Sequence, residues 1–134
     1  MTNGITLTEA VTILAVLMLF YASVPVGQAR GKHGIKAPAM TGHEDMDRAV
    51  RVHMNSLEQY ALFLPLLWVA TLTFTWLTWL PAAFGIVWIV ARLIYMRAYL
   101  RDPGSRSFGF SLGLLATLGL LVMSVAGVVM AWMA

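Results

Sequence analysis

Residues 107–132 read SFGFSLGLLATLGLLVMSVAGVVMAW and contain no charged side chain. A helix needs about 20 mainly apolar residues to cross the hydrocarbon core of a bilayer, so this run is long enough to span one. Three further apolar runs precede it, and we expect helices at about residues 5–26, from residues 44–47 to about 76–80, and at about 81–101. The chain is therefore expected to be an all-α integral membrane protein, a bundle of four transmembrane helices.

Polar or helix-breaking segments separate these runs. The segment from Gly27 to Asp47 is expected to be a loop, because it contains several glycines and a proline: Gly27, Gly31, Gly34, Pro38 and Gly42. A short turn at residues 79–81 is expected to join the second and third helices, and residues 102–105 to join the third and fourth. The sequence shows no internal repeat, and a chain of 134 residues is long enough for one domain. We therefore expect a single domain over residues 1–134.

The composition argues against a soluble protein. Hydrophobic residues make up 60% of the chain and charged residues only 11%, whereas soluble domains are about a quarter charged. The net charge is +3, but the basic residues lie between apolar runs, so lipid headgroups or small anions are expected partners and nucleic acid is not. The chain has no cysteine. Any thiol chemistry must therefore use a thiol that the substrate brings.

The distribution of basic residues predicts the orientation. All nine lie in or beside the first and third connections: Arg30, Lys32, Lys36, Arg48, Arg51, Arg92, Arg97, Arg101 and Arg106. Because basic loops stay in the cytoplasm, we expect both termini on the non-cytoplasmic side of a multi-pass membrane protein. In a bacterium this would be the inner membrane.

Some polar residues lie deeper in the predicted membrane spans than the basic residues that set the orientation of the chain need to lie. Arg51, Asn55 and Glu58 are spaced i, i+4 and i+7, so they share one face of the second helix. The third helix carries a similar stripe, which consists of Arg92, Tyr95 and Tyr99. A charge at such depth costs at least about 2.5 kcal/mol unless it is paired or faces a wet cavity.

These two stripes predict a polar pocket that opens to the cytoplasmic face. We expect Glu58 and Arg92 either to approach each other or to bind opposite ends of one ligand. For these two residues alone, a buried ion pair that only sets the helix register is an equally good interpretation. The additional tyrosines, Asn55, Arg51 and Arg106 favour a pocket for a polar anion with several carboxylates and one ammonium group.

The sequence also contains two weaker patterns. His33, His43 and His53 are ten residues apart, which is not a helical ligand spacing, so no metal site is expected. Gly109 and Gly113 form a GxxxG pattern that favours close helix packing, either inside one subunit or between subunits.

Two motifs resemble the MAPEG superfamily, the membrane-associated proteins in eicosanoid and glutathione metabolism. The first is DRAVRVHMNSLE at residues 47–58, preceded by Thr41 and Gly42. The second extends from RLIY at residues 92–95 through Tyr99 to Arg106. Within this superfamily, the motifs resemble those of leukotriene-C synthase and the microsomal glutathione transferases.

This resemblance implies a homotrimer that binds glutathione between neighbouring subunits at the cytoplasmic side. By the family pattern, the glutathione-binding residues would be Arg30, Arg51, Asn55, Glu58, Arg92, Tyr95 and Tyr99. Arg106 would be the catalytic residue that faces the sulfur and stabilises the thiolate. The thiolate would attack a lipophilic electrophile that arrives from the bilayer, or reduce a lipid hydroperoxide.

The sequence departs from the family pattern in three places. Gln59 stands where some members have an aromatic residue, and Phe110 stands where several have a tyrosine. The loop before Arg106 is also short.

The sequence leaves two alternative functions open. They are a non-catalytic lipid-binding scaffold on the same fold and a small four-helix multidrug transporter. A scaffold would not need so many polar ligands, and a transporter would need an acid deep in its first helix, where Glu9 lies near the outer end.

Overall fold

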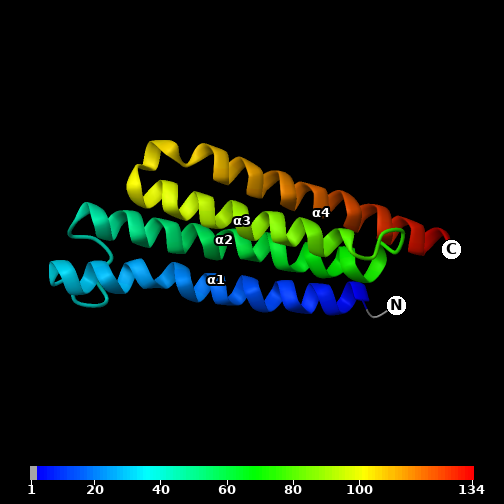
Figure 1. Ribbon diagram of the computed structural model, residues 1–134, viewed down its shortest axis with the longest axis horizontal. Helices are drawn as coiled ribbons and strands as arrows, with labels where there is room; N and C mark the ends of the chain where they lie inside the picture. Colours follow the sequence, from blue (N-terminus) through cyan, green and yellow to red (C-terminus); the bar gives the residue numbers. More distant parts are fainter. Residues whose placement is uncertain (1–2) are drawn as a thin grey trace.

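The computed structural model describes residues 3–134 and consists of four long helices that run up and down in sequence (Figure 1). Their bounds are α1 Asn3–His33, α2 Glu44–Thr73, α3 Leu80–Arg101 and α4 Ser107–Met133, with a short 3₁₀ helix at Pro103–Ser105. The described residues contain no strand, which confirms the all-α prediction. The first two residues of the predicted domain lie outside the described range. The start of α1 and the end of α4 lie at the same end of the bundle.

Helix α1 is longer than predicted. It continues through Gly27 and Gly31, so the prediction that the loop begins at Gly27 was wrong, and the connection is only residues 34–43. The helix ends where Gly34 adopts a φ of 63° and the Ile35 N–H donates to the Arg30 carbonyl at 3.0 Å. This is the usual glycine C-terminal cap. Glycine lowers helix stability by about 1 kcal/mol without forbidding the helix, and basic residues in the last turn favour its continuation.

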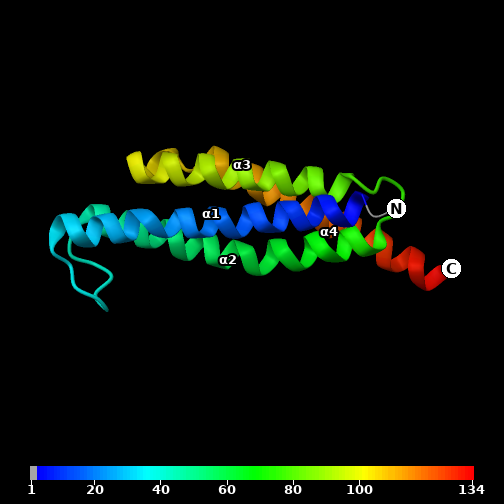
Figure 2. The same ribbon diagram turned by 60° about the horizontal axis from the view of Figure 1, so that its bottom comes forward.

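Helix α2 begins where the acidic residues predicted. His43 is its N-cap, and Nδ1 of His43 accepts the Asp45 N–H at 3.1 Å. The ring of His33, from the end of α1, lies 2.9 Å from the Asp45 carboxylate and holds the pKa of that carboxyl below its usual range. Side-chain hydrogen bonds to Asp45 therefore connect α1 to α2 at their junction, which lies at the left in Figure 2.

The end of α2 differs from the prediction. The helix ends at Thr73, not at residues 76–80, because Phe74 has an extended backbone. The Phe74 N–H donates the last hydrogen bond of the helical pattern, to the Ala70 carbonyl. The apolar sequence continues through the connection, where the rings of Phe74 and Trp76 meet edge to face at 4.9 Å. Hydropathy alone therefore does not mark this helix end. Helix α3 begins at Leu80, with Pro81 in its first turn.

Three of the helices are long and apolar enough to cross a membrane: α1, α3 and the segment from Pro103 to Met133 that contains α4. Helix α2 carries acids in its first turn and Glu58 further along. The crossing of all four helices and the side on which the termini lie remain predictions.

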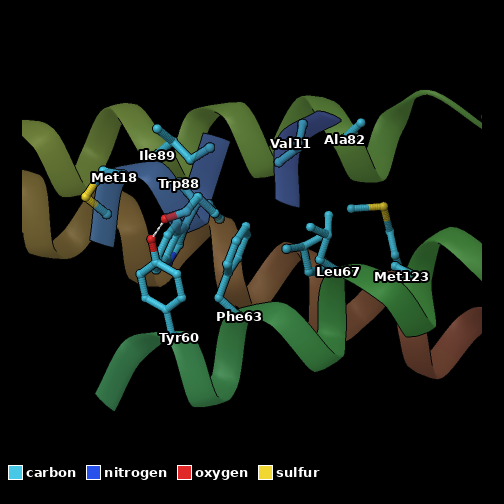
Figure 3. Packing of buried hydrophobic residues seen from close by; sticks show 13 residues of the cluster. Val11, Met18, Tyr60, Phe63, Leu67, Ala82, Trp88, Ile89 and Met123 are labelled. Carbon is cyan, nitrogen blue, oxygen red and sulfur yellow. Dashed lines mark hydrogen bonds between the residues drawn. The ribbon is translucent and has the colours of Figure 1, made fainter. Parts of the chain in front are cut away.

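An aromatic cluster fills the centre of the bundle (Figure 3). The fully buried rings of Phe63 and Trp88 stack at 3.9 Å, and Tyr60 meets Trp88 edge to face at 5.0 Å. The Tyr60 hydroxyl donates to the Ala15 carbonyl and so connects α2 to α1. Large apolar side chains such as Phe20 and Val122 point outward instead and are about two-thirds exposed. This distribution suits a protein whose exterior is solvated by lipid tails.

Candidate functional site

A polar pocket of about 630 Å³ lies between α2, α3 and the start of α4. Its volume is in the range of small-molecule sites, which is about 300–1,000 Å³. The residues that line it are Arg51, Asn55, Glu58 and Gln59 of α2, Tyr95 and Tyr99 of α3, Arg106, and Ser107, Phe110 and Ser111 of α4. Six of the eight residues predicted from the sequence are thus brought together.

The α2 wall presents opposite charges that a ligand can reach. Arg51 donates to one carboxylate oxygen of Glu58 at 3.3 Å, and the Asn55 amide donates to the other at 3.5 Å. The side chains of Arg51 and Glu58 are each about half exposed. An exposed ion pair contributes only about 0.2–1 kcal/mol, so a ligand with its own charges can replace it at little cost.

Arg92 lies behind this wall instead of in it. Its side chain is 2% exposed, and Nη2 donates to Asn55 Oδ1 at 2.8 Å and to Ser56 Oγ at 3.1 Å. Its guanidinium also lies 4.3 Å from the centre of the Tyr95 ring. A direct approach of Glu58 to Arg92 is not found, because Asn55 stands between them and bonds to both. Arg92 therefore holds Asn55 and Tyr95 in place from within the bundle.

Gly109 allows α4, which forms one wall of the pocket, to pack closely against α3. A Cβ atom added at this residue would lie 2.5 Å from the Tyr95 nitrogen and 2.9 Å from the Ala91 carbonyl oxygen. Only glycine therefore allows the first turn of α4 to pack so closely on α3. The GxxxG pattern is used for a contact inside the subunit, and it places Arg106 and Ser107 at the pocket.

The start of α4 combines a cation with free backbone donors. Arg106 is the N-cap residue of α4, and no side chain caps this helix end. Its guanidinium donates to the Pro103 carbonyl at 3.2 Å. Unpaired N–H groups and the helix dipole favour an anion at a helix N-terminus, and a guanidinium adds to this effect.

The connection that carries Arg106 is held by several hydrogen bonds. The Ser105 hydroxyl donates to the Ala98 carbonyl at 3.1 Å, and the Asp102 carboxylate accepts the Gly104 N–H at 3.1 Å. Arg48 of α2 donates to the carbonyls of Leu100 and Arg101 at 3.4 and 3.3 Å. These bonds restrict the loop before the site.

Two predicted ligands do not line the pocket of their own chain. Arg92 is the buried support described above, and Arg30 lies near the end of α1, where it donates to the Ala39 carbonyl at 2.6 Å. A role for Arg30 in this pocket requires a neighbouring subunit and remains a prediction.

Ser107 and Ser111 also line the pocket and were not among the residues predicted from the sequence. They are spaced i, i+4 and so share one face of α4 at its start, where both line the pocket beside Arg106. This spacing was the available signal. It was missed because serine is common at the start of helices for reasons of capping alone.

Comparison with known proteins identifies the family. The model of the MAPEG family matches residues 8–126. The chain belongs to the MAPEG family. Together with the three apolar helices, this membership makes it a membrane protein.

Relatives of this MAPEG protein align over most of its length. It is 36% identical to microsomal glutathione S-transferase 2 of Mus musculus over 128 residues, which is 96% of this chain and 86% of the relative. It is 35% identical to leukotriene C4 synthase of Bos taurus over 106 residues, covering 79% of this chain and 69% of the relative. An uncharacterized protein of Synechocystis is 38% identical over 112 residues, 84% of this chain and 80% of the relative.

Proposed function

We propose that this MAPEG protein is a membrane-bound glutathione transferase that activates the thiolate of glutathione for attack on lipophilic electrophiles. The names of its relatives support a glutathione-dependent transferase at the level of the family. The observation that carries the proposal for this chain is the pocket itself. It joins an exposed carboxylate, an exposed guanidinium and an uncapped helix N-terminus beside a second guanidinium.

Glutathione matches the charges of this pocket. The tripeptide has one ammonium group, two carboxylates and a thiol. Glu58 would pair with the ammonium group and Arg51 with a carboxylate, while Asn55, Tyr95 and Tyr99 offer polar groups along the walls. In the proposed homotrimer, Arg30 of a neighbouring subunit would supply a further cation.

The reaction needs the thiolate, because the neutral thiol is a poor nucleophile. Arg106 and the N–H groups at the start of α4 would stabilise the negative charge on sulfur and so lower the pKa of the thiol. The sulfur lone pair then forms a carbon–sulfur bond, and the electrons of the broken bond go to the leaving group or to an opened epoxide oxygen. The proton released from the thiol balances the charge on that product.

A peroxidase reaction is a second use of the same thiolate. Attack on a lipid hydroperoxide breaks the oxygen–oxygen bond and gives an alcohol and the sulfenic acid of glutathione. A second glutathione then reduces this acid to water and glutathione disulfide. The apolar exterior of α1, α3 and α4 is consistent with acceptors of either kind that arrive from the bilayer.

A thiolate titration tests the proposal. Glutathione is added to the protein in detergent at neutral pH, and ultraviolet absorbance of the thiolate is followed. We expect a stoichiometric thiolate signal that Arg106→Ala abolishes. The matched control is Arg97→Ala, which removes an exposed arginine outside the pocket and is expected to keep the signal.

The other outcomes separate the alternatives. Binding of glutathione without any thiolate in the wild-type protein would favour the lipid-binding scaffold. An equal signal in Arg106→Ala would show that another group activates the thiol. Absence of glutathione binding would reject the proposed function.

A further inference from the structure

One narrow face of α3 combines apolar residues with two arginines at its end. Five residues are spaced i, i+4, i+8, i+11 and i+15 along the helix: Ile86, Val90, Ile94, Arg97 and Arg101. At 3.6 residues per turn they lie within about 80° of arc. Ile86 and Val90 are more than two-fifths exposed, and both arginines are exposed as well. Because α3 is long and apolar enough to cross a membrane, lipid can reach this face along its length.

This face of α3 is separate from the polar pocket. Tyr95 and Tyr99, which line the pocket, precede and follow Arg97 by two residues. A step of two residues turns about 200° around a helix, so Arg97 lies on the opposite side of α3 from both tyrosines. A ligand held by Arg97 and Arg101 would therefore lie outside the proposed glutathione site.

Arg97 and Arg101 differ from the other arginines in their partners. The arginine side-chain bonds found within residues 3–134 are all made by five other residues: Arg30, Arg48, Arg51, Arg92 and Arg106. Asp102 is the acid nearest to Arg101 in the sequence, and its carboxylate accepts the Gly104 N–H at 3.1 Å. The two guanidinium groups of this face thus have no protein partner in the described part of the chain.

The C-terminus of α3 does not use these two arginines as caps. Basic side chains near a helix C-terminus often bond to its last carbonyl groups. Here Arg48 of α2 donates to the carbonyls of Leu100 and Arg101. The Ser105 hydroxyl donates to the carbonyl of Ala98. Like charges at i, i+4 also repel each other, so an anion that binds both guanidinium groups would relieve this repulsion.

We propose that Arg97 and Arg101 bind the headgroup phosphate of an anionic phospholipid, whose acyl chain lies along the apolar part of the same face. Guanidinium groups bind phosphate through paired N–H donors. The i, i+4 spacing places the Cβ atoms of the two residues about 5–6 Å apart, close enough to share one headgroup. Two cations without a facing acid favour a headgroup with a net negative charge over a zwitterionic one.

The test adds lipid to the full-length protein in detergent and follows thermal unfolding. Phosphatidylglycerol should raise the Tm of the wild type, because a ligand that binds only the folded state stabilises it. Phosphatidylcholine of the same chain length should raise the Tm less, because its headgroup is zwitterionic. Inorganic phosphate should also raise it less, because it has no acyl chain to contact the apolar part of the face. Native mass spectrometry of the same samples measures the bound lipid.

A double variant, Arg97→Gln with Arg101→Gln, should weaken phosphatidylglycerol binding by about tenfold or more. Both side chains are exposed and make no bond within residues 3–134, so this variant should fold with the Tm of the lipid-free wild type. The matched control is Lys32→Gln with Lys36→Gln. It removes the same charge from exposed residues outside α3 and should bind the lipid as the wild type does.

Three results would overturn the proposal. The first is that phosphatidylcholine or inorganic phosphate raises the Tm as much as phosphatidylglycerol does. The second is that the arginine variant binds phosphatidylglycerol as the wild type does. The third is an equal loss of binding in the lysine control, which would show that net charge alone attracts the lipid.

Discussion

Asn55 connects two charged groups at the wall of the pocket. It receives a hydrogen bond from the buried Arg92 and gives one to Glu58, so it stands between a buried cation and an accessible anion. Within residues 3–134 the Nε atom of Arg92 has no hydrogen-bond partner, which makes the hydrogen bonds of Nη2 more important to this charge. A buried charge that loses a hydrogen-bond acceptor keeps its full desolvation penalty.

We therefore expect Asn55→Ala to lower the free energy of unfolding by about 1.5–3 kcal/mol, the usual range for a hydrogen bond to a charged group. Glutathione affinity should fall in the same variant. Gln59→Ala is the control, because Gln59 lines the same pocket without a bond to Arg92. Thermal unfolding in detergent measures the difference, and equal Tm values for the two variants would contradict this account of Asn55.

At the scale of the element, the glycines of α4 differ in what they allow. Gly109 lies against the α3 backbone, whereas a Cβ atom at Gly113 would meet its nearest neighbour, the Ala91 Cβ, at an ordinary 3.6 Å. The first of the two therefore determines how close the start of α4 comes to α3.

Gly109→Ala should push the start of α4 away from α3 and destabilise the protein by about 1–3 kcal/mol, as overpacking does. Because Arg106 moves with this turn, the thiolate signal should fall as well. Gly113→Ala adds the same methyl group four residues later and should retain the signal. A normal signal and Tm in Gly109→Ala would show that the close contact with Tyr95 does not position the site.

Two substitutions with opposite expected effects on stability test the length of α1. Gly31 lies in the helix with nothing within 4 Å of an added Cβ, so Gly31→Ala should stabilise the protein by about 0.5–1 kcal/mol. Gly34 has a positive φ, so Gly34→Ala should destabilise it. Thermal unfolding reports both signs. A neutral effect at Gly31 would indicate that the helix ends earlier, as its glycines predicted.

At the scale of the whole molecule, the site is incomplete within one chain if Arg30 takes part. Its guanidinium is held at the Ala39 carbonyl and does not line the pocket of its own subunit. The proposed homotrimer would allow one chain to supply Arg30 and the next to supply Arg51.

Mixed oligomers can test this arrangement. Arg30→Ala and Arg51→Ala chains should each bind glutathione weakly when expressed alone. When they are co-expressed, some interfaces should combine an intact Arg30 with an intact Arg51, and part of the binding should return. Calorimetry on the doubly tagged, purified mixture measures the recovery. If no binding returns, the two arginines do not act across a subunit interface.

The sequence by itself determined the local properties of this protein. Long apolar runs separated by polar segments predicted four helices, and the i, i+4, i+7 spacing predicted that Arg51, Asn55 and Glu58 share a face. These predictions succeed because the period of a helix depends only on neighbouring residues. The ends of α1 and α2 were less accessible to sequence reasoning, since Gly27 and the apolar residues after Thr73 are compatible with both helix and loop.

Only the tertiary structure decided which side chains from different helices meet. It placed Asn55 between Glu58 and Arg92, and it stacked His33 on His43 across a ten-residue interval. Such contacts depend on the axial register and rotation of whole helices, which close packing determines through residues such as Gly109. Spacing along the chain carries no information about that register, so the polar faces and the pocket they share could be predicted from the sequence, whereas the individual side-chain contacts between helices could not.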